Sequence, residues 1–228
     1  MLLLNNHIHR LIDLALEEDI GPGDVTTQTT IDPEIIAEAH VRAKQELVVA
    51  GLPVAQAVFA HLDDEVIFAP RVDDGDLVPA GTVLAQVVGP AALLLLGERV
   101  ALNFLMRLSG IATWTRAFVE AVQPHPARIV DTRKTTPGWR VLEKYAVQVG
   151  GAANHRCGLF DGLLIKDNHV AAAGGIAAAV QLAKQGAPHT LKVEVEVPDL
   201  AGLEEAMAAG ADIVLLDNMD EATLARAV

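Results

Sequence analysis

Cysteine and basic residues are the scarce residue types in this 228-residue chain. The single cysteine, Cys157, excludes a disulfide framework and any zinc site built on several thiolates. Only 17 basic residues stand against 30 acidic ones, so the net charge is -13 with neutral histidines. This excess of negative charge opposes broad binding to nucleic acid or to an anionic membrane surface, because both need an extended basic face. We therefore expect any anion-binding site to be local.

The sequence also lacks long apolar runs. The longest, at 91–96, is far shorter than the ~20 residues that span a bilayer. Residues 1–6 have neither the positive charge nor the extended apolar core of a signal peptide. With 51% hydrophobic and 21% charged residues, the chain can bury enough apolar surface to fold. We expect a globular, cytoplasmic protein without a membrane partner.

Two glycine-rich nucleotide motifs are missing as well. Neither G-x-G-x-x-G nor G-x-x-x-x-G-K-[ST] occurs, which excludes a Rossmann dinucleotide loop and a Walker P-loop. The acidic segment 73–76 lacks the rest of a calcium loop, and we interpret it as a turn.

The first half of the chain predicts helices and antiparallel strands. The expected elements are a helix over 7–18, short strands between 36 and 88, a helix over 53–61 and a helix over 98–122. The last helix is expected to be interrupted near Ser109 and Gly110, because glycine weakens helical continuity.

After Pro124, strands alternate with alanine-rich helices, which is typical of a parallel sheet or barrel. Strands are expected at 128–133, 162–166, 191–197 and 211–216, with helices at 137–149, 176–185 and 200–209. The third strand places Val193 and Val195 on one face and Glu194 and Glu196 on the other. An open sheet covered on both faces would bury these carboxylates at a cost, whereas a barrel lumen could hold them. An edge strand with a solvated charged face remains an alternative.

Basic residues gather in one part of the chain. Seven of the 17 lie in 128–169, which carries a net charge of +3 while the rest carries -16. Arg133 and Lys134 follow the first strand, Lys166 ends the second, and Asp217 follows the fourth. Carboxyl ends of strands are where α/β folds build their sites. The pattern predicts a site for a small polyanionic ligand.

Neighbouring residues are interpreted in the same way. His155 and Arg156 lie on the following loop and could bind a carboxylate through charge-assisted hydrogen bonds. Cys157 fits a buried inert thiol better than a nucleophile, and His169 could orient the loop that follows the second strand. Two further basic residues, Arg140 and Lys144, are spaced as i, i+4 on a predicted helix, and we interpret them as surface charges.

Longer motifs extend over nearly the whole chain. They include residues 18–26 (EDIGPGDVT), 98–103, 109–113, 131–138 (DTRKTTPG), 144–146, 150–151, 154–156 (NHR), 165–170 (IKDNHV), 193–197 (VEVEV) and 215–218 (LLDN). In these motifs the chain resembles the quinolinate phosphoribosyltransferases, the carboxylating nicotinate-nucleotide pyrophosphorylases of NAD biosynthesis.

The resemblance implies an α/β fold with an N-terminal open sandwich over 1–122 and an incomplete α/β barrel over 123–228. Family members continue well past the motif at 215–218, so we expect C-terminal barrel strands to be missing from this chain. The resemblance also implies a homodimer or higher homo-oligomer. The implied reaction converts quinolinate and phosphoribosyl pyrophosphate to nicotinate mononucleotide, pyrophosphate and CO2, with Mg2+.

Residue roles follow from the same resemblance. The two quinolinate carboxylates would be held by Arg133, His155, Arg156 and Lys166, with Arg99 from the neighbouring subunit. Lys134 and Lys166 would meet the pyrophosphate, and Glu196 and Asp217 would face the ribose hydroxyls and the magnesium ion. The expected catalytic residues are therefore Lys134, Lys166, Glu196 and Asp217. Such charges stabilise an oxocarbenium-like transition state where its charge develops.

Three alternatives stay open. One is a molybdenum-transport-associated protein of the same fold, and another is an inactive, truncated chain that acts as a structural partner. Residues 72–84 also look like a domain that carries lipoate or biotin, although 45–98 contain no lysine to modify. Substrate binding discriminates among them: Arg133→Ala or Lys166→Ala should remove most dicarboxylate affinity, whereas Lys144→Ala should change little.

Overall fold

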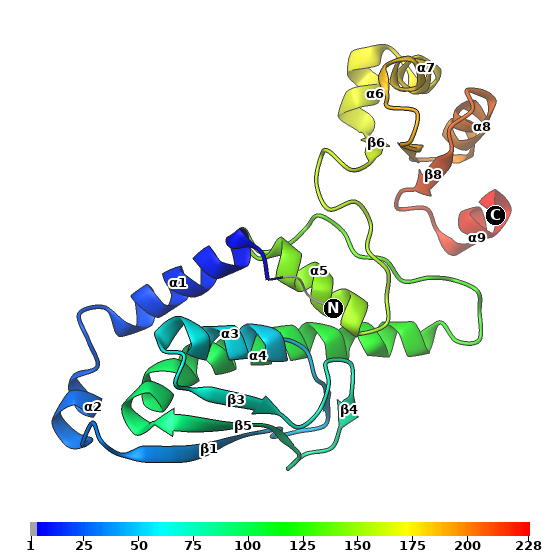
Figure 1. Cartoon of the computed structure of the whole chain (residues 1–228). Coiled ribbons are helices and arrows are strands. Elements are labelled where there is room, and N and C mark those ends of the chain that lie inside the picture. Colours follow the sequence, from blue (N-terminus) through cyan, green and yellow to red (C-terminus); the bar gives the residue numbers. More distant parts are fainter. Residues whose placement is uncertain (1–3) are drawn as a thin grey trace. The chain divides into compact units, whose positions relative to one another are not determined.

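The computed structural model describes residues 4–228, which form two compact units divided between residues 155 and 156 (Figure 1). The first unit contains the described residues up to His155, and the second contains 156–228. Residues 1–3, which begin the segment where we expect no signal peptide, lie outside the described part.

An antiparallel sheet forms one layer of the first unit. Its strands are β1 (Ile36–Arg42), β3 (Ile67–Pro70) and β5 (Val83–Pro90), in the order β1-β5-β3. A second pair joins β2 (Leu47–Val48) to β4 (Leu77–Val78), also antiparallel. The predicted antiparallel strands between 36 and 88 are thus confirmed.

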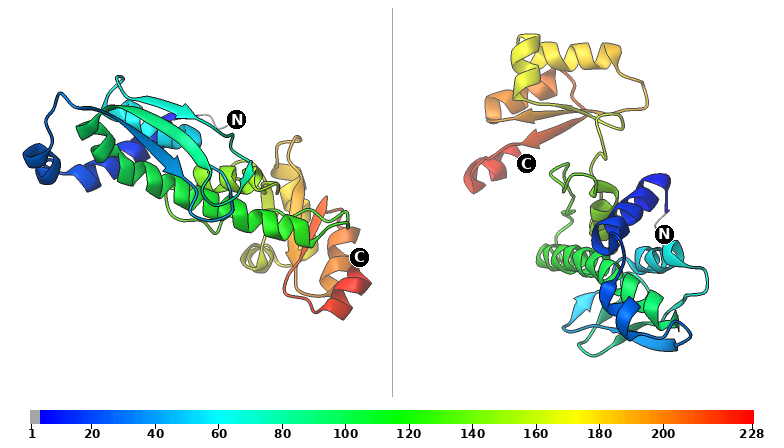
Figure 2. Two further views of the ribbon diagram at one scale, coloured as in Figure 1. Left: turned by 90° about the horizontal axis from the view of Figure 1, so that it is seen from below. Right: turned by 90° about the vertical axis from the view of Figure 1, so that its left-hand side faces the viewer.

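The helices of this unit are α1 (Asn6–Ile20), α2 (Val25–Thr30), α3 (Leu52–Leu62), α4 (Ala91–Ala121) and α5 (Arg140–Val149). Helices α3 and α4 pack on the sheet, α1 and α5 pack on these helices, and α2 contacts α4 (Figure 2). Helix α1 begins where the Asn5 side chain accepts hydrogen bonds from two backbone N–H groups, and it buries Ile8, Ile12 and Leu16. Helix α2 was not predicted, because a six-residue helix shows too little periodicity to recognise.

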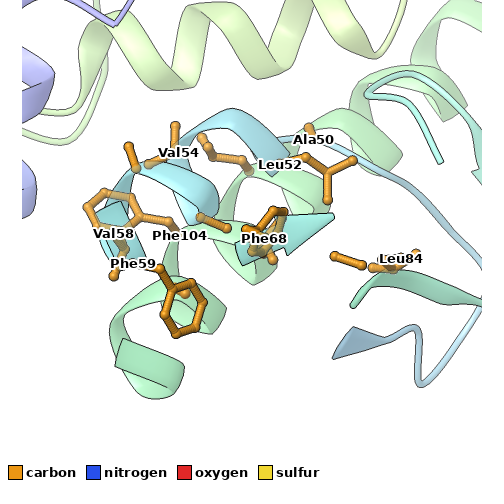
Figure 3. Close-up of a cluster of buried hydrophobic side chains, with 14 of the residues drawn as sticks. Ala50, Leu52, Val54, Val58, Phe59, Phe68, Leu84 and Phe104 are labelled. Carbon is orange, nitrogen blue, oxygen red and sulfur yellow. The ribbon is translucent and has the colours of Figure 1, made fainter. Parts of the chain in front are cut away.

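The core of the first unit lies between the sheet and helices α3 and α4 (Figure 3). Val54 and Val58 of α3 and Phe104 of α4 are at most 1% exposed, and Phe68 of β3 packs in the same cluster. This cluster fixes α4 on the sheet, because close-packed side chains leave little room for displacement.

Helix α4 is continuous through Ser109 and Gly110, so the predicted interruption is wrong. The hydroxyl of Ser109 accepts from the backbone N–H of Ala50 (3.0 Å) and donates to its carbonyl oxygen (3.2 Å). The flanking Leu108 and Ala112 are fully buried. Packing on both sides of Gly110 outweighs the ~1 kcal/mol that a mid-helix glycine costs.

Helix α5 packs closely on α4 at Gly150. A Cβ atom there would lie 2.5 Å from the carbonyl oxygen of Ala112 and 2.6 Å from the Cβ of Thr115, so only glycine allows this approach. The contact explains why the chain up to His155 belongs to the first unit.

The domain boundary at 122/123 stays a prediction. The strand expected at 128–133 is reduced to one parallel bridge, Val130 to Ala153.

The second unit has a three-stranded parallel sheet in the order β6-β7-β8. Its elements are β6 (Leu163–Ile165), α6 (Asp167–Ala173), α7 (Ile176–Gly186), β7 (Val193–Val197), α8 (Leu200–Ala208), β8 (Ile213–Leu216) and α9 (Glu221–Ala227). The predicted alternation of strands and helices is confirmed, while the short helices α6 and α9 were not predicted. The fold is mixed α/β; a barrel and its missing strands stay predictions.

Strand β7 has one apolar and one acidic face, as its sequence predicts. Val193, Val195 and Val197 are at most 2% exposed and belong to the core cluster that also contains Val180 of α7 and Ala206 of α8. Glu194 and Glu196 therefore point to the opposite face. The alternative of an edge strand with a solvated charged face is wrong, because β7 lies between β6 and β8 and Glu194 is only 7% exposed.

Candidate functional site

Two short segments of the first unit, each followed by predicted site residues, lie side by side. Val130 and Ala153 form the parallel bridge, with backbone bonds from Ala153 N to Ile129 O (2.9 Å) and from Asp131 N to Ala153 O (3.2 Å). Because the segments run parallel, the residues that follow each of them leave at the same end. Arg133 and His155 are both among these residues, as expected for a shared site.

Behind these segments lies a buried ion pair between Lys144 and Asp131. The distance from Lys144 Nζ to Asp131 Oδ1 is 2.5 Å, and the two side chains are 4% and 8% exposed. Lys144 Nζ also donates to the carbonyl oxygen of His155 (3.1 Å), while His155 N donates to Asp131 Oδ1 (2.8 Å). The interpretation of Lys144 as a surface charge is therefore wrong. Helix α5 turns this side chain inward, toward a carboxylate that sequence spacing did not indicate.

The second oxygen of Asp131 is also bonded. The side-chain amide of Asn154, oriented with its nitrogen toward the carboxylate, donates to Asp131 Oδ2 (2.9 Å) and to Lys144 O (3.0 Å), and its oxygen accepts from Gln148 (3.1 Å). Both carboxylate oxygens thus have partners, which a buried charge requires.

Arg133 carries a buried donor that the described residues leave without a partner. Its Nε is shielded from solvent and makes no hydrogen bond within residues 4–228. An unsatisfied buried N–H is costly, so an anionic ligand that accepts from it would be stabilised. Arg140 supports the same loop, because its Nε donates to Thr135 Oγ1 (3.0 Å) and its Nη2 to Arg133 O (3.4 Å). Arg140 is thus half-buried and bonded to the loop, and its interpretation as a surface charge is wrong.

Glu143 of α5 holds the next part of that loop. It accepts from Arg107 Nη2 (2.7 Å), from Thr136 Oγ1 (2.7 Å) and from Thr136 N (3.2 Å). Burial raises the pKa of Glu143, but the hydrogen bonds from Arg107 and Thr136 outweigh it and hold the pKa below its ordinary value. Glu143 therefore stays ionised near neutral pH. The sequence analysis did not identify this residue as part of the site, because one glutamate in a predicted helix is indistinguishable from a surface charge.

Two predicted cations of the first unit face solvent. Lys134 is exposed, and its backbone N–H donates to Thr132 Oγ1 (3.0 Å). Arg99 lies on an exposed face of α4. Both side chains are accessible to a ligand or to another chain.

In the second unit, Lys166 and Glu196 lie together. Lys166 follows β6, and its Nζ lies 3.2 Å from Oε2 of Glu196 on β7. The backbone N–H of Lys166 donates to Nδ1 of His169 (3.0 Å), a contact that fits the expectation that His169 orients this loop. The ion pair joins two residues expected to be catalytic.

Asp217 lies at the carboxyl end of the neighbouring strand. Its backbone N–H donates to the carbonyl oxygen of Val197 (3.0 Å), and Leu215, two residues earlier, pairs with Glu196. Glu196 and Asp217 are thus near the ends of adjacent strands. No group of three or more histidine, cysteine or acidic side chains in residues 4–228 could hold a metal ion. Two carboxylates nevertheless suit magnesium, which keeps water ligands and shares its coordination with phosphates.

The remaining predicted residues precede β6. Arg156 Nη1 donates to the carbonyl oxygen of Gly162 (3.1 Å). Cys157 is half-buried instead of fully buried, and its backbone N–H donates to Asp161 (2.7 Å). The loop is therefore tied to its own unit by local bonds.

The chain matches family models over most of its length. Residues 24–109 match "Quinolinate phosphoribosyl transferase, N-terminal domain", and residues 111–228 match "Quinolinate phosphoribosyl transferase, C-terminal domain".

Curated relatives agree with the family models. A probable nicotinate-nucleotide pyrophosphorylase [carboxylating] of Synechocystis is 50% identical over 213 residues, which cover 93% of this chain and 72% of the relative. The protein of the same name in Bacillus subtilis is 48% identical over 215 residues, which cover 93% and 74%. A quinolinate phosphoribosyltransferase [decarboxylating] of Nicotiana tabacum is 42% identical, and 62% of its length is covered.

Solved structures are similar as well. The crystal structure of NadC from Streptococcus pyogenes has a TM-score of 0.95 and 44% identity, with 100% of this chain and 80% of that chain covered. The nicotinate-nucleotide pyrophosphorylase of Francisella tularensis gives a TM-score of 0.95 at 40% identity, with the same coverage.

Proposed function

The chain belongs to the quinolinate phosphoribosyl transferase family, and from this premise we propose how its residues carry out the reaction. The enzyme transfers the phosphoribosyl group of phosphoribosyl pyrophosphate to the nitrogen of quinolinate. Pyrophosphate and CO2 leave, and nicotinate mononucleotide is formed for NAD biosynthesis. The related molybdenum-transport-associated protein is not favoured, since both family models and the curated relatives carry the quinolinate enzyme's name.

Quinolinate is the ligand that the first unit's cations accommodate. The observation that carries this proposal is the buried Nε of Arg133, a donor without a partner in the described residues. A carboxylate would supply the missing acceptor through a charge-assisted bond. His155 lies at the same end of the paired segments. Arg156 and Lys166, with Arg99 of a second copy, complete the proposed set for the two carboxylates.

Decarboxylation needs no redox cofactor. Once the ring nitrogen is ribosylated, the cationic pyridinium ring accepts the electron pair of the breaking bond between C2 and the carboxylate, and a proton then takes the place of CO2. The protein's contribution is to hold two highly charged reactants in a reactive arrangement. Fixed cations at the two quinolinate carboxylates perform that positioning.

The remaining predicted residues would bind phosphoribosyl pyrophosphate. Lys134 and Lys166 would meet the departing pyrophosphate, while Glu196 and Asp217 would face the ribose hydroxyls and hold Mg2+, directly or through water. Magnesium, when bound, neutralises negative charge on the diphosphate. The pairing of Lys166 with Glu196 at 3.2 Å supports a common location for these roles.

Helix α4 supports a homodimer or higher homo-oligomer. Its exposed side carries Arg99 and three apolar residues, Met106, Trp114 and Phe118. These apolar residues are 49% to 68% exposed. Exposed apolar groups gathered on one helix mark an interaction surface. A second copy bound there would bring Arg99 toward its partner's site. Within residues 4–228 no helix has both the length and the apolar character needed to span a bilayer. Since the similar bacterial proteins are enzymes of metabolism, we propose a cytoplasmic location.

Calorimetric titration tests the function. The chain should bind pyridine-2,3-dicarboxylate in preference to pyridine-3-carboxylate, because only the former offers two carboxylates to the cations. Product formation from phosphoribosyl pyrophosphate and quinolinate should require magnesium. Equal affinity for both pyridines, or binding of neither, would contradict the proposal.

A further inference from the structure

Lys144 is a buried cation that has no role in the proposed reaction. The residue is 3% exposed and lies on α5, facing Asp131. A buried ion pair is weak evidence for stability, because the desolvation of both charges can exceed their attraction. A role in geometry is the better explanation for such a pair beside a binding site.

The hydrogen bonds of this pair hold the backbone of His155 from both sides. Its N–H donates to Asp131 Oδ1 (2.8 Å), and its carbonyl oxygen accepts from Lys144 Nζ (3.1 Å). The ion pair at 2.5 Å closes the ring of contacts. Neither peptide group that flanks the His155 Cα can rotate without breaking one of these bonds.

The same helix also supports the Arg133 segment. Arg140 donates to the carbonyl oxygen of Arg133 (3.4 Å), and Glu143 accepts from Thr136, three residues farther along the loop. Residues 140, 143 and 144 share one helix face because their spacing is i, i+3, i+4. Helix α5 therefore acts as a template on which both quinolinate-binding segments are fixed.

We propose that Lys144 is a positioning residue for the dicarboxylate site: through Asp131 and the His155 carbonyl, it sets where His155 stands relative to Arg133. This inference rests on the proposed function, since it assigns the purpose of the arrangement to quinolinate binding. A misplacement of about 1 Å by a residue outside the chemistry can cost a hundredfold in activity.

Three variants separate positioning from folding. Lys144→Met keeps the length of the side chain and removes its charge. Asp131→Asn combined with Lys144→Met removes the carboxylate charge that the first variant leaves unpaired. Leu142→Ala is the matched control, because Leu142 is 1% exposed on the same helix and belongs to the first unit's hydrophobic core. For each variant, we would measure the thermal midpoint, quinolinate affinity by calorimetry and KM for phosphoribosyl pyrophosphate.

Lys144→Met should weaken quinolinate binding about tenfold or more, as expected for a displaced binding group, while KM for phosphoribosyl pyrophosphate stays unchanged. The double variant should regain its thermal midpoint and not its quinolinate affinity. Leu142→Ala should lower the midpoint and bind quinolinate normally.

The inference would be overturned if the double variant recovered its quinolinate affinity together with its thermal midpoint. It would also be overturned if Leu142→Ala lost as much quinolinate affinity as Lys144→Met. The double variant also keeps the test decisive if Lys144→Met does not fold. Failure of the unmodified chain to bind quinolinate is a separate outcome, which would overturn the proposed function and this inference with it.

Discussion

The two units each contain an ion pair next to predicted site residues, and the two pairs differ in burial. Lys144 and Asp131 of the first unit are 4% and 8% exposed and bond to the neighbouring backbone. Lys166 and Glu196 of the second unit are 45% and 17% exposed. A buried, multiply bonded pair fixes a scaffold, whereas a lysine that is nearly half exposed can exchange its partner for a substrate. The difference fits the proposed roles, in which the first pair supports the site and the second contacts the reactants.

The strongest test of this difference is the loss of the buried cation. Lys144→Met should lower the free energy of unfolding by about 3–5 kcal/mol, because the Asp131 carboxylate would remain buried without its counter-charge. Urea denaturation of the variant and the unmodified chain measures this. If the free energy of unfolding fell by less than about 1 kcal/mol, as is usual for exposed pairs, the two ion pairs would not differ in their contribution to stability.

Arg133 tests the ligand side of the same unit. Arg133→Ala should weaken quinolinate binding by about 1.5–3 kcal/mol, the range for a hydrogen bond to a charged group. Arg128→Ala is a suitable control, because Arg128 is an exposed cation of the same basic region. Equal losses in the two variants by calorimetry would indicate a diffuse basic field instead of a defined site.

Glu143 sharpens the comparison through pH. Its pKa is lower in the folded chain than in the unfolded one, so its contribution to stability is fully present above the unfolded value and disappears as pH falls through the folded value. At neutral pH, Glu143→Gln should cost about 1–2 kcal/mol. That difference should shrink below the ordinary glutamate pKa of about 4.3. Denaturation curves at a series of pH values would contradict this if the difference stayed constant.

The smallest effect on stability is expected in the second unit. Glu196→Gln should change the free energy of unfolding by about 0–1 kcal/mol, because its partner Lys166 is half-exposed. Its catalytic rate should nevertheless fall, since the proposed role of Glu196 lies at the ribose and the magnesium ion. A large stability loss with full activity would reverse the roles assigned to the two pairs.

The sequence predicted those features that depend on local patterns. Alternation of valine and glutamate located both faces of β7, and the ends of the strands located Lys166 and Asp217. The roles proposed for these residues in the reaction came from the family resemblance, because strand ends alone do not identify a substrate.

The missed features depend on contacts between distant residues. In a helical pattern Lys144 cannot be told from a surface lysine. Its partner Asp131 lies 13 residues away in the sequence, next to the bridge between Val130 and Ala153. The continuity of α4 at Gly110 likewise depends on the backbone of Ala50, 59 residues from Ser109. Neither contact has a signature in nearby sequence.

Gly150 contributes to the site by lacking a methyl group. Its bare Cα lets α5 approach Ala112 and Thr115 of α4, and α5 in turn carries the charged side chains that bond to the proposed binding loops. Gly150→Ala would push α5 away from α4 and leave every charge in place. We therefore expect this added methyl group to shift the loops without removing any group that would contact a ligand.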